Sequence, residues 1–513
     1  MAPLSAAILE SSGLQIGNEF ADLSWHRKVF VLEAAPAWRK DMLDIYNRAV
    51  KVSHSTAAQQ EFAEVGTRTL ENFCIVGAGS SGLAAAKAFA EAGIPFDCLE
   101  RNDDVGGNWY YGRPHSSVYA STHTISSKRL TEYVDFPMPA EYPEYPHHTQ
   151  VWEYLKSYAR RFGLYERIEF NTEIARIERA GGEASQQGDW IVRLSDGRVR
   201  RYRGVVICNG HNWKPRVPQF ALNANGARID ARVIHSAEYK TPDVLIGKRV
   251  LVVGAGNSGC DIAVEAAQHA AATLHSTRRG YHYLPKFWRG KPIDMLNEQL
   301  LRWRFPLPVR RLLGSLIERV AFGSPGSNGL PVPDHKLFES HPIINQQLYY
   351  YLAHGRIRPK PDVAGLVAAA GEPLEVRFTD GSREQVDLVV LATGFQIAFP
   401  FLDRELLNWH NGRPELFLNV FHPTRNDLFV VGLIQPDSGQ FGLVDRQARL
   451  VARYITAADR SDSTAERFRR LKTNSATPLD GGVRYLTTER HLLEVEHFSY
   501  RRKLDGMLEM FPV

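Results

Sequence analysis

Two short stretches of this sequence carry glycine at their first, third and sixth positions. They are Gly-Ala-Gly-Ser-Ser-Gly over residues 77–82 and Gly-Ala-Gly-Asn-Ser-Gly over residues 254–259. Glycines at this spacing let a strand turn tightly into a helix, let the backbone approach a pyrophosphate, and let the helix pack closely on the strand. Unpaired N–H groups at the start of such a helix favour phosphate. The sequence therefore predicts two dinucleotide sites in one chain.

The elements expected around the first fingerprint fit this chemistry. The apolar run 73–76 predicts a buried strand, the alanine-rich run 83–92 a helix, and the run 96–99 a second strand. Glu100 follows that second strand, where a carboxylate accepts hydrogen bonds from ribose hydroxyls. An ordinary glycine turn beside an exposed glutamate is the alternative. The predicted cofactor contacts are Gly77, Gly79, Ser80, Ser81, Gly82 and Glu100.

The second fingerprint follows the apolar run 249–253 and precedes a predicted helix over 261–272. No acid ends the next strand, where the chain carries Arg278 and Arg279 instead. A guanidinium binds a 2′-phosphate through two hydrogen bonds and a carboxylate would repel it, so NADPH is favoured over NADH. Alternatives are a solvated loop for the arginines and a helix-dipole role, as a first-turn acid, for Asp261. The predicted contacts are Gly254, Gly256, Asn257, Ser258, Gly259, Asp261, Arg278 and Arg279.

Composition points to a large enzyme without nucleic acid as a partner. The 513 residues carry 62 basic and 57 acidic side chains, a net charge of +5 that is too small to indicate nucleic-acid binding. The four cysteines form no C-x-x-C pair, which argues against a dithiol flavin reductase or a zinc ribbon, and no metal is expected. The first residues lack a signal-peptide pattern, and no apolar run reaches about 18 residues. We therefore expect a soluble, cytoplasmic protein without a transmembrane segment.

The order of segments predicts three regions. Residues 1–70 form an N-terminal extension with helical spacing near its end. Two apolar runs, 204–211 and 386–395, each end in a glycine-containing turn at which the chain is expected to change domain. The expected divisions are a first dinucleotide domain over 71–239 and 386–513, and a second inserted over 240–385.

Further motifs give residues 71–513 a family resemblance. The stretches that carry it are D-V-G-G-N-W at 104–109, S-S-K at 126–128, D-F-P at 135–137, His235-Ser236 with Tyr239, A-T-G-F at 392–395, G-L-I-Q-P at 432–436 and Q-A-R at 447–449. In this order they resemble the flavin-containing monooxygenases, class B flavoprotein monooxygenases related to the Baeyer–Villiger monooxygenases.

The resemblance implies a fold, cofactors and an activity. The fold would be α/β, with two Rossmann-like dinucleotide-binding domains and the NADPH domain inserted into the FAD domain. The N-terminal extension, which the resemblance does not cover, is expected to be mainly helical from its spacing. NADPH would reduce FAD, O2 would add at flavin C4a, and the hydroperoxide would pass one oxygen atom to the nitrogen or sulfur of a small organic substrate. A homodimer is left open. Further implied cofactor contacts are Gly107, Asn108, Trp109, Ser126, Thr393 and Gln435.

One departure from the family pattern leaves alternatives open. Before Ser126 the family usually places an asparagine that touches flavin and nicotinamide, and here Ile125 stands there without a hydrogen-bonding group. Thr124 and His123 are the nearby polar candidates. Alternatives to oxygenation of nitrogen or sulfur are Baeyer–Villiger oxygenation of a ketone, an uncoupled NADPH oxidase that releases hydrogen peroxide, and a flavoprotein without enzymatic activity.

Overall fold

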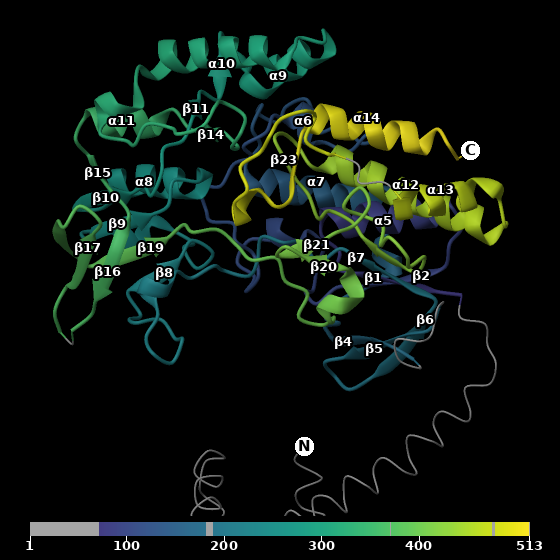
Figure 1. The fold of residues 1–513 in the computed structure, drawn as a ribbon. Helices are drawn as coiled ribbons and strands as arrows, with labels where there is room; N and C mark the ends of the chain where they lie inside the picture. The colour runs from purple at the N-terminus through teal and green to yellow at the C-terminus, as the bar shows by residue number, and fades with distance from the viewer. Residues whose placement is uncertain (1–70, 181–187, 370, 475–477, 512–513) are drawn as a thin grey trace, which may run out of the picture. The chain divides into compact units, whose positions relative to one another are not determined.

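Two parallel sheets form the framework of the computed structural model, which describes residues 71–180, 188–369, 371–474 and 478–511. These ranges belong to one unit of the chain (Figure 1). The expected helical extension over 1–70 lies outside the described residues.

The first sheet has five parallel strands in the order β22-β7-β1-β2-β3. Its central strands β1 and β7 are buried along their whole length, as expected for parallel strands that are covered on both faces. This burial explains why their sequences are continuous apolar runs. The bounds are β1 Phe73–Val76, β2 Phe96–Leu99, β3 Ile168–Glu169, β7 Gly204–Ile207 and β22 Leu428–Val430.

The second sheet repeats this design in the order β15-β10-β9-β19-β8. All of its strand pairs are parallel. In the chain, every strand of this sheet lies between β7 and β22 of the first, so one sheet is inserted within the other in sequence. The bounds are β8 Val233–His235, β9 Arg249–Val253, β10 Ala272–Ser276, β15 Ile357–Lys360 and β19 Leu388–Leu391.

Strand pairing corrects the two expected domain boundaries. β19 pairs with β9 and β8, so the run that begins near residue 386 belongs to the second sheet and the chain returns to the first only after it. β8 also lies in the second sheet, which therefore begins before residue 240. The expected limits of 240–385 were too narrow because a short apolar strand does not indicate which sheet it joins.

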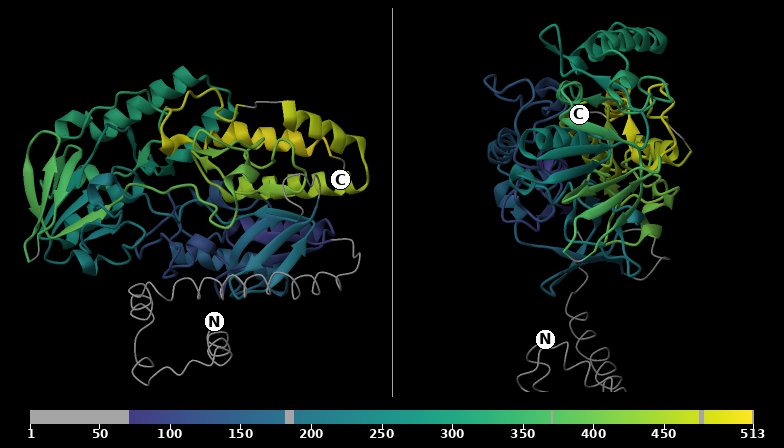
Figure 2. Two further views of the ribbon diagram at one scale, coloured as in Figure 1. Left: turned by 60° about the horizontal axis from the view of Figure 1, so that its bottom comes forward. Right: turned by 90° about the vertical axis from the view of Figure 1, so that its left-hand side faces the viewer.

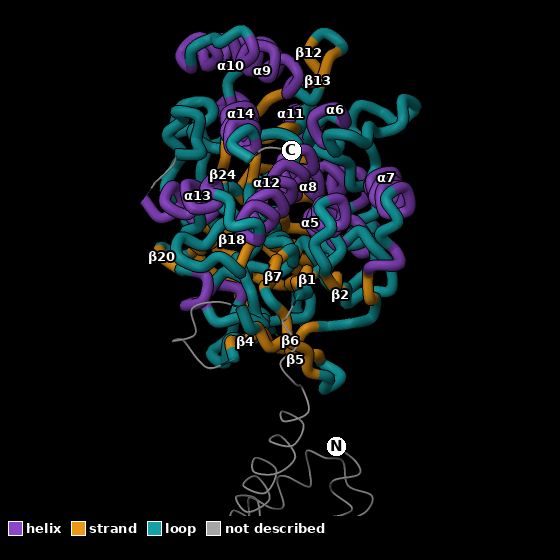
Figure 3. Tube along the Cα trace, turned by 90° about the vertical axis from the view of Figure 1, so that its right-hand side faces the viewer, coloured by secondary structure: helices purple, strands orange, loops and turns teal. Residues whose placement is uncertain are grey.

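Helices cover the first sheet. Figures 1 and 3 show α5 and α12 lying over β1, β7 and β2, and these two helices pack on one another. α5 and α8 begin inside their fingerprints, at Ser80 and Asn257, three to four residues earlier than the sequence indicated. The helix bounds are α5 Ser80–Glu91, α6 Lys128–Thr131, α7 His148–Arg161, α8 Asn257–His269, α9 Ile293–Arg302, α10 Leu307–Phe322, α11 Gln347–Ala353, α12 Phe441–Asp459, α13 Ser463–Asn474 and α14 His497–Leu508.

Smaller sheets complete the unit. Two of them are antiparallel and three-stranded, with the orders β4-β5-β6 and β16-β17-β18. Their bounds are β4 Ile174–Arg179, β5 Trp190–Leu194, β6 Val199–Tyr202, β16 Val363–Val367, β17 Leu374–Phe378 and β18 Arg383–Val386. The two-stranded pairs are β11 Tyr283–Leu284 with β14 Ile343–Ile344, β12 Phe287–Trp288 with β13 Lys291–Pro292, β20 Trp409–His410 with β21 Arg413–Pro414, and β23 Gln435–Pro436 with β24 Glu494–Val495.

The segment between β10 and β15 builds an outer layer. Figures 1 and 2 show α9 and α10 at the edge of the described unit, beyond α11. Among the described helices, none combines the length and the apolar content that a membrane crossing requires.

Candidate functional site

The two fingerprint turns require glycine for the same steric reason. Gly77 and Gly254, which begin them, have φ angles of +95° and +110°, a region that favours glycine. A Cβ on Gly82 would lie 1.8 Å from the carbonyl oxygen of Gly77, and one on Gly259 would lie 1.9 Å from that of Gly254. The third glycine of each fingerprint therefore lets the helix approach the turn that precedes it.

Both helix starts suit a phosphate group. Gly79 and Gly256 are the N-cap residues of α5 and α8, and neither helix has a side-chain cap or an acid in its first turn. Backbone N–H groups at these two starts are consequently available to an anion. Asp261 lies beyond the first turn of α8, so the alternative that it is a first-turn acid is wrong.

The first fingerprint opens into a pocket that we call the fingerprint pocket. Eight residues predicted to contact a cofactor line it, namely Gly77, Gly79, Ser80, Ser81, Glu100, Gly107, Asn108 and Trp109. Gly82 lies beneath it and acts through packing. The remaining lining includes Arg101, Asn102, His115, Thr172, Glu173, Asn209, His211, Asn212, Trp213, Gly432 and Gln440.

Glu100 is held rigidly at the end of β2. One carboxylate oxygen accepts a hydrogen bond from the backbone N–H of Ala78 at 2.7 Å, and the other accepts from the backbone and side-chain amides of Asn102 at 2.9 and 2.8 Å. Its side chain is buried and borders the fingerprint pocket. The carboxylate therefore has a fixed orientation from which it can accept further hydrogen bonds.

The loop around residues 106–109 closes over the fingerprint turn. A Cβ on Gly107 would lie 2.9 Å from the Cα of Gly79, so two backbones meet here at a distance that only glycine permits. The Asn108 side-chain oxygen accepts from the backbone and hydroxyl of Ser117 at 2.7 and 2.9 Å. These bonds fix the loop that carries Trp109 along the pocket.

At the second fingerprint, two predicted contacts have partners within the fold. The Asn257 side-chain oxygen accepts from the backbone of Ile344 at 3.1 Å. Asp261 accepts from the side-chain amide of Asn345 at 2.7 Å, and burial raises the pKa of its carboxyl. These side chains join α8 to the chain at β14. Ser258, next to Asn257, is half-buried at the start of α8.

The two arginines after β10 differ in their surroundings. Arg278 is exposed and has no hydrogen bond or ion pair with any described residue. Arg279 forms an ion pair with Asp334 at 2.8 Å. Arg278 is therefore the guanidinium that is available to a ligand at the end of this strand.

Sequence reasoning missed an arginine from a distant part of the chain. Arg490 approaches the second fingerprint, with a guanidinium nitrogen 3.9 Å from where a Cβ of Gly256 would stand, and it lies 5.0 Å from the ring centre of Tyr281. It comes from a short turn near β24, more than 200 residues after Gly256. No motif around Arg490 signals this proximity, because it arises from tertiary packing.

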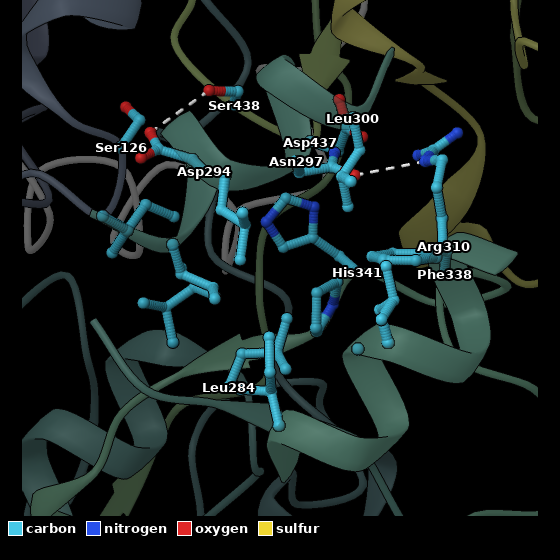
Figure 4. Close-up of a pocket in the computed structure, with 18 residues that line it drawn as sticks. Ser126, Leu284, Asp294, Asn297, Leu300, Arg310, Phe338, His341, Asp437 and Ser438 are labelled. Atoms are coloured by element: carbon cyan, nitrogen blue, oxygen red, sulfur yellow. Dashed lines mark hydrogen bonds between the residues drawn. The ribbon is translucent and has the colours of Figure 1, made fainter. Parts of the chain in front are cut away.

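Figure 4 shows a second pocket, which we call the apolar pocket. Its walls come from three regions that are distant in sequence: the loop before α6, the segment from β11 to β14 with α9 and α10, and the loop after β23. Eight of the eighteen lining residues are isoleucine or leucine. The lining residues are Ile125, Ser126, Leu284, Ile293, Asp294, Leu296, Asn297, Leu300, Arg310, Leu313, Gly314, Ile317, Phe338, His341, Pro342, Ile344, Asp437 and Ser438.

The carboxyl groups in the apolar pocket are held by donors from other segments. Asp294 accepts from the backbone of Ser127 at 2.7 Å and from the hydroxyl of Ser438 at 3.4 Å, and burial raises its pKa. Burial, with the Glu496 carboxylate close by, raises the pKa of Asp437 to about 7. Asp294 thus ties α9 to the loop that carries Ile125.

The three residues expected near flavin and nicotinamide lie on one loop with different environments. Ile125 and Ser126 line the apolar pocket. The Ser126 hydroxyl is 2.8 Å from that of Thr131. Thr124 is buried, and its hydroxyl has no hydrogen-bond partner among the described residues. Thr124 is thus an unpartnered polar group beside Ile125, but it lines neither the fingerprint pocket nor the apolar pocket.

Two other predicted contacts have roles within the fold. The Thr393 hydroxyl donates to the carbonyl of Arg216 at 2.5 Å. The Gln435 amide donates to Glu494 at 2.8 Å, within the β23–β24 pair. Gln440, which the sequence did not single out, borders the fingerprint pocket and donates to the carbonyl of Gly432 at 3.2 Å. Its place beyond the G-L-I-Q-P motif is the signal that could have indicated it.

Comparison with known proteins supplies the family. The model described as flavin-binding monooxygenase-like matches residues 71–489. Flavin-containing monooxygenase 5 of Rattus norvegicus is 30% identical over 460 residues, which cover 86% of this chain and 83% of that protein.

The chain belongs to the flavin-containing monooxygenase family. Dimethylaniline monooxygenase [N-oxide-forming] 2 of Rattus norvegicus is 33% identical over 77% of this chain and 75% of its own length. A crystal structure of cyclohexanone monooxygenase with bound ε-caprolactone aligns with a TM-score of 0.62 at 18% identity, over 85% of this chain and 98% of that one. The protein is accordingly an FAD- and NADPH-dependent monooxygenase that acts on a small molecule with O2.

Proposed function

We propose that this flavin-containing monooxygenase transfers one oxygen atom from O2 to a nitrogen or sulfur atom of a small organic substrate. In this proposal FAD occupies the fingerprint pocket, NADPH lies on the second fingerprint, and the substrate enters the apolar pocket. Bound FAD, once reduced by NADPH, supplies the activation of O2. The side chains of the protein bind, orient and exclude water.

The fingerprint residues divide these binding tasks. Gly77, Gly79 and the start of α5 would hold the FAD pyrophosphate, with Glu100 accepting from a ribose. Gly254, Gly256 and the start of α8 would hold the NADPH pyrophosphate. Arg278 would bind the 2′-phosphate, and Arg490 would stand beside the pyrophosphate.

The single observation that carries the proposal is the wall shared by the two pockets. Asp437 and Ser438 line the apolar pocket, and Gln440, two residues further on, lines the fingerprint pocket. A substrate in the apolar pocket would therefore be separated from the cofactor by a single stretch of chain. An amine or a thioether supplies its own lone pair, so such a site needs water exclusion more than it needs an acid or a base.

The positions of the arginines bear on the choice between nitrogen or sulfur oxygenation and ketone oxygenation. Ketone oxygenation needs a cation that stabilises developing negative charge at the reacting centre. Arg278 and Arg279 are not among the residues that line the apolar pocket. Arg310 lines it, but its guanidinium bonds to Asn297 at 3.2 Å and lies 5.3 Å from the ring centre of Phe338. Arg278 and Arg279 therefore lie away from the pocket. Arg310 is the one arginine in its lining, and its Nη2 is buried without a partner among the described residues, so it is the cation that the ketone alternative would use.

Product analysis tests the proposal. The purified yellow protein is incubated with NADPH and O2, and separately with N,N-dimethylaniline, methyl phenyl sulfide or cyclohexanone. We expect the N-oxide and the sulfoxide by mass spectrometry, with much less lactone. Lactone as the main product would instead establish ketone oxygenation.

The same reactions decide the role of Ile125. Hydrogen peroxide formed per NADPH consumed measures uncoupling. We expect Ile125→Asn to lower this ratio, because an amide would provide the hydrogen bonds that isoleucine lacks. Val134→Asn is a matched control, since Val134 is an exposed apolar residue nine positions further along the chain that is not part of the apolar pocket lining. A wild-type ratio near one with every substrate would contradict the proposal and favour an oxidase.

A further inference from the structure

The apolar pocket contains two carboxyl groups that differ in their bonding. Both oxygens of Asp294 accept hydrogen bonds, Oδ1 from the backbone of Met295 at 2.9 Å and Oδ2 from the backbone of Ser127 at 2.7 Å. Asp437 accepts through Oδ1 from the backbone of His497 at 2.8 Å. Its Oδ2 has no hydrogen-bond partner among the residues that the structure describes. Asp437 therefore brings an available carboxylate oxygen to the lining of the pocket.

Asp437 belongs to the wall that separates the apolar pocket from the fingerprint pocket. Asp437 and Ser438 line the first pocket, and Gln440 lines the second. Figure 4 shows Asp437 across the apolar pocket from Leu284. A substrate atom bonded to Asp437 would therefore lie on the cofactor side of the pocket, with the rest of the molecule against isoleucine and leucine side chains.

Acidic groups outnumber permanent cations around Asp437. The hydroxyl of Tyr485 lies close to the carboxyls of Asp437, of a residue in β24 and of the residue that caps α14. These two glutamates are 7% and 1% exposed. The neighbouring charged or titratable groups are Glu494, Glu496, Tyr485, Arg310 of α10 and His341. An anionic ligand beside Asp437 would add to the negative charge, whereas a cationic ligand would offset it. The charges therefore favour a cation.

Protonation distinguishes the two kinds of substrate atom in the proposed function. An alkylamine resembles the lysine side chain, whose usual pKa is about 10.4, so at pH 7 it is almost entirely an ammonium ion. An ammonium nitrogen has no lone pair to accept an oxygen atom, whereas a thioether keeps its lone pairs at every pH. A basic amine must therefore lose a proton before it is oxygenated, and a sulfide need not.

We propose that Asp437 is a catalytic base for basic amines, which binds the ammonium ion in the apolar pocket and takes its proton before oxygen transfer. This inference deepens the proposed function and rests on it. The N–H bond breaks, the nitrogen keeps the electron pair, and the proton goes to Oδ2 of Asp437. The apolar walls exclude water that would otherwise compete for the ammonium ion.

The reaction balances with this step included. A tertiary ammonium ion, NADPH and O2 give an amine N-oxide, NADP⁺ and water, so the proton that Asp437 removes is the one that formation of water consumes. Burial, with the Glu496 carboxylate close by, raises the pKa of Asp437 to about 7. A base is most effective when its pKa lies near the working pH, because it then both accepts and returns a proton.

The pH dependence of amine turnover tests the proposal. The substrates are N,N-dimethylbenzylamine, which is a basic amine, and benzyl methyl sulfide, which is similar in shape and cannot be protonated at these pH values. Because Asp437 must be ionised to accept a proton, the ratio of amine to sulfide turnover should rise around pH 7 in the wild type. In Asp437→Asn only the neutral amine reacts, so the ratio at pH 7 should fall at least about tenfold and recover near the pKa of the amine. An unchanged ratio at pH 7 would overturn the proposal.

Three further variants show whether the effect belongs to Asp437. Asp294→Asn is the comparison within the pocket and should keep the wild-type ratio, because both oxygens of Asp294 are already bonded. Asp380→Asn, at an exposed turn between β17 and β18, controls for the change of charge. Glu496→Gln should move the rise of the ratio to lower pH, because a like charge near Asp437 is removed. A ratio that falls in Asp294→Asn and not in Asp437→Asn would assign the base to Asp294 and overturn the proposal.

Proton release on binding is a readout that needs no turnover. N,N-dimethylbenzylamine is added to the oxidised, flavin-loaded protein in weakly buffered solution with a pH indicator. With a pKa of about 7, about half of Asp437 is protonated at pH 7, so binding should release about half a proton per site. At pH 8.5, where Asp437 is already an anion, binding should release almost none. Equal release at both pH values would overturn the proposal. Absence of sulfoxide would contradict the proposed function, and proton release would then still decide the role of Asp437.

Discussion

The two fingerprint units share the backbone of their glycine turns. They differ in the residue that follows the second strand and in the side chain that bonds to the first glycine of the turn. In both, the third glycine packs against the carbonyl of the first. A Cβ added to the third glycine would lie 1.8 Å from that carbonyl oxygen in the first unit and 1.9 Å from it in the second. The first unit ends its second strand in Glu100, which is buried and held by hydrogen bonds from Ala78 and Asn102. The second ends it in Arg278, exposed and without a described partner. The shared glycine turn suits the pyrophosphate, which both cofactors contain. The residue after the second strand, Glu100 or Arg278, suits the ribose, which carries a 2′-phosphate only in NADPH.

A second difference lies beneath the turns. The carbonyl of Gly77 accepts from the Cys98 thiol at 3.8 Å, whereas that of Gly254 accepts from the His275 imidazole at 3.0 Å. Strand register places the two donors at equivalent positions, since Cys98 pairs with Ile75 and His275 with Val252. One unit therefore rests on a thiol and the other on an imidazole, whose pKa burial lowers.

The largest expected effect tests the shared packing. Gly82→Ala should release FAD and Gly259→Ala should weaken NADPH while leaving the protein yellow, because each new methyl group overlaps a carbonyl oxygen. Overpacking of this kind costs about 1–3 kcal/mol of folding stability; a strain of that size carried by the cofactor-binding turn would weaken binding roughly 5- to 150-fold. Flavin absorbance after gel filtration and NADPH titration measure the two effects. Gly506→Ala in α14, with no atom within 4 Å, is the control. Equal loss of FAD in both variants would show that the units are not independent.

A smaller effect tests the arginine that distinguishes the units. Arg278→Ala should weaken NADPH by about 10- to 100-fold, the range for a lost charge-assisted hydrogen bond, and should leave NADH nearly unchanged. Arg279→Ala is the control, because that side chain is paired with Asp334. The measurement is the flavin reduction rate against cofactor concentration without oxygen. Equal weakening of both cofactors would refute the 2′-phosphate assignment.

The smallest effect tests the difference beneath the turns. Burial lowers the pKa of His275, so in the range just below pH 6.5 the unfolded chain binds a proton that the folded chain does not. Stability from His275 is therefore present above pH 6.5 and declines as the pH falls below it. His275→Cys, which copies the first unit, should flatten the loss of stability between pH 7.5 and pH 5.5. Denaturant unfolding at both pH values measures this.

The thiol offers the matching comparison. Burial raises the pKa of Cys98 well above its usual 9.0, so this group stays protonated over the same range. Cys98→Ser should leave the slope between pH 7.5 and pH 5.5 unchanged. A slope that His275→Cys leaves unaltered would assign the pH dependence to other buried histidines.

Local sequence determined the parts of this protein that are built by neighbours in the chain. The two strand-turn-helix units, Glu100 and Arg278 at the strand ends, and the family itself could all be recognised from motifs, because the contacts that require those residues lie within about 30 positions. The family model and the relatives confirmed the family.

Tertiary structure decided what distant segments make together. Only strand pairing placed β8 and β19 in the second sheet, because an apolar run is equally suited to either. Only packing gave Asn257 and Asp261 their partners at β14 and brought Arg490 to Gly256. The apolar pocket joins three segments, and the charged neighbours of Asp437 come from α10, from the residue that caps α14 and from the chain before β14. Such contacts are set by burial across the whole chain, and no short pattern of residues encodes them.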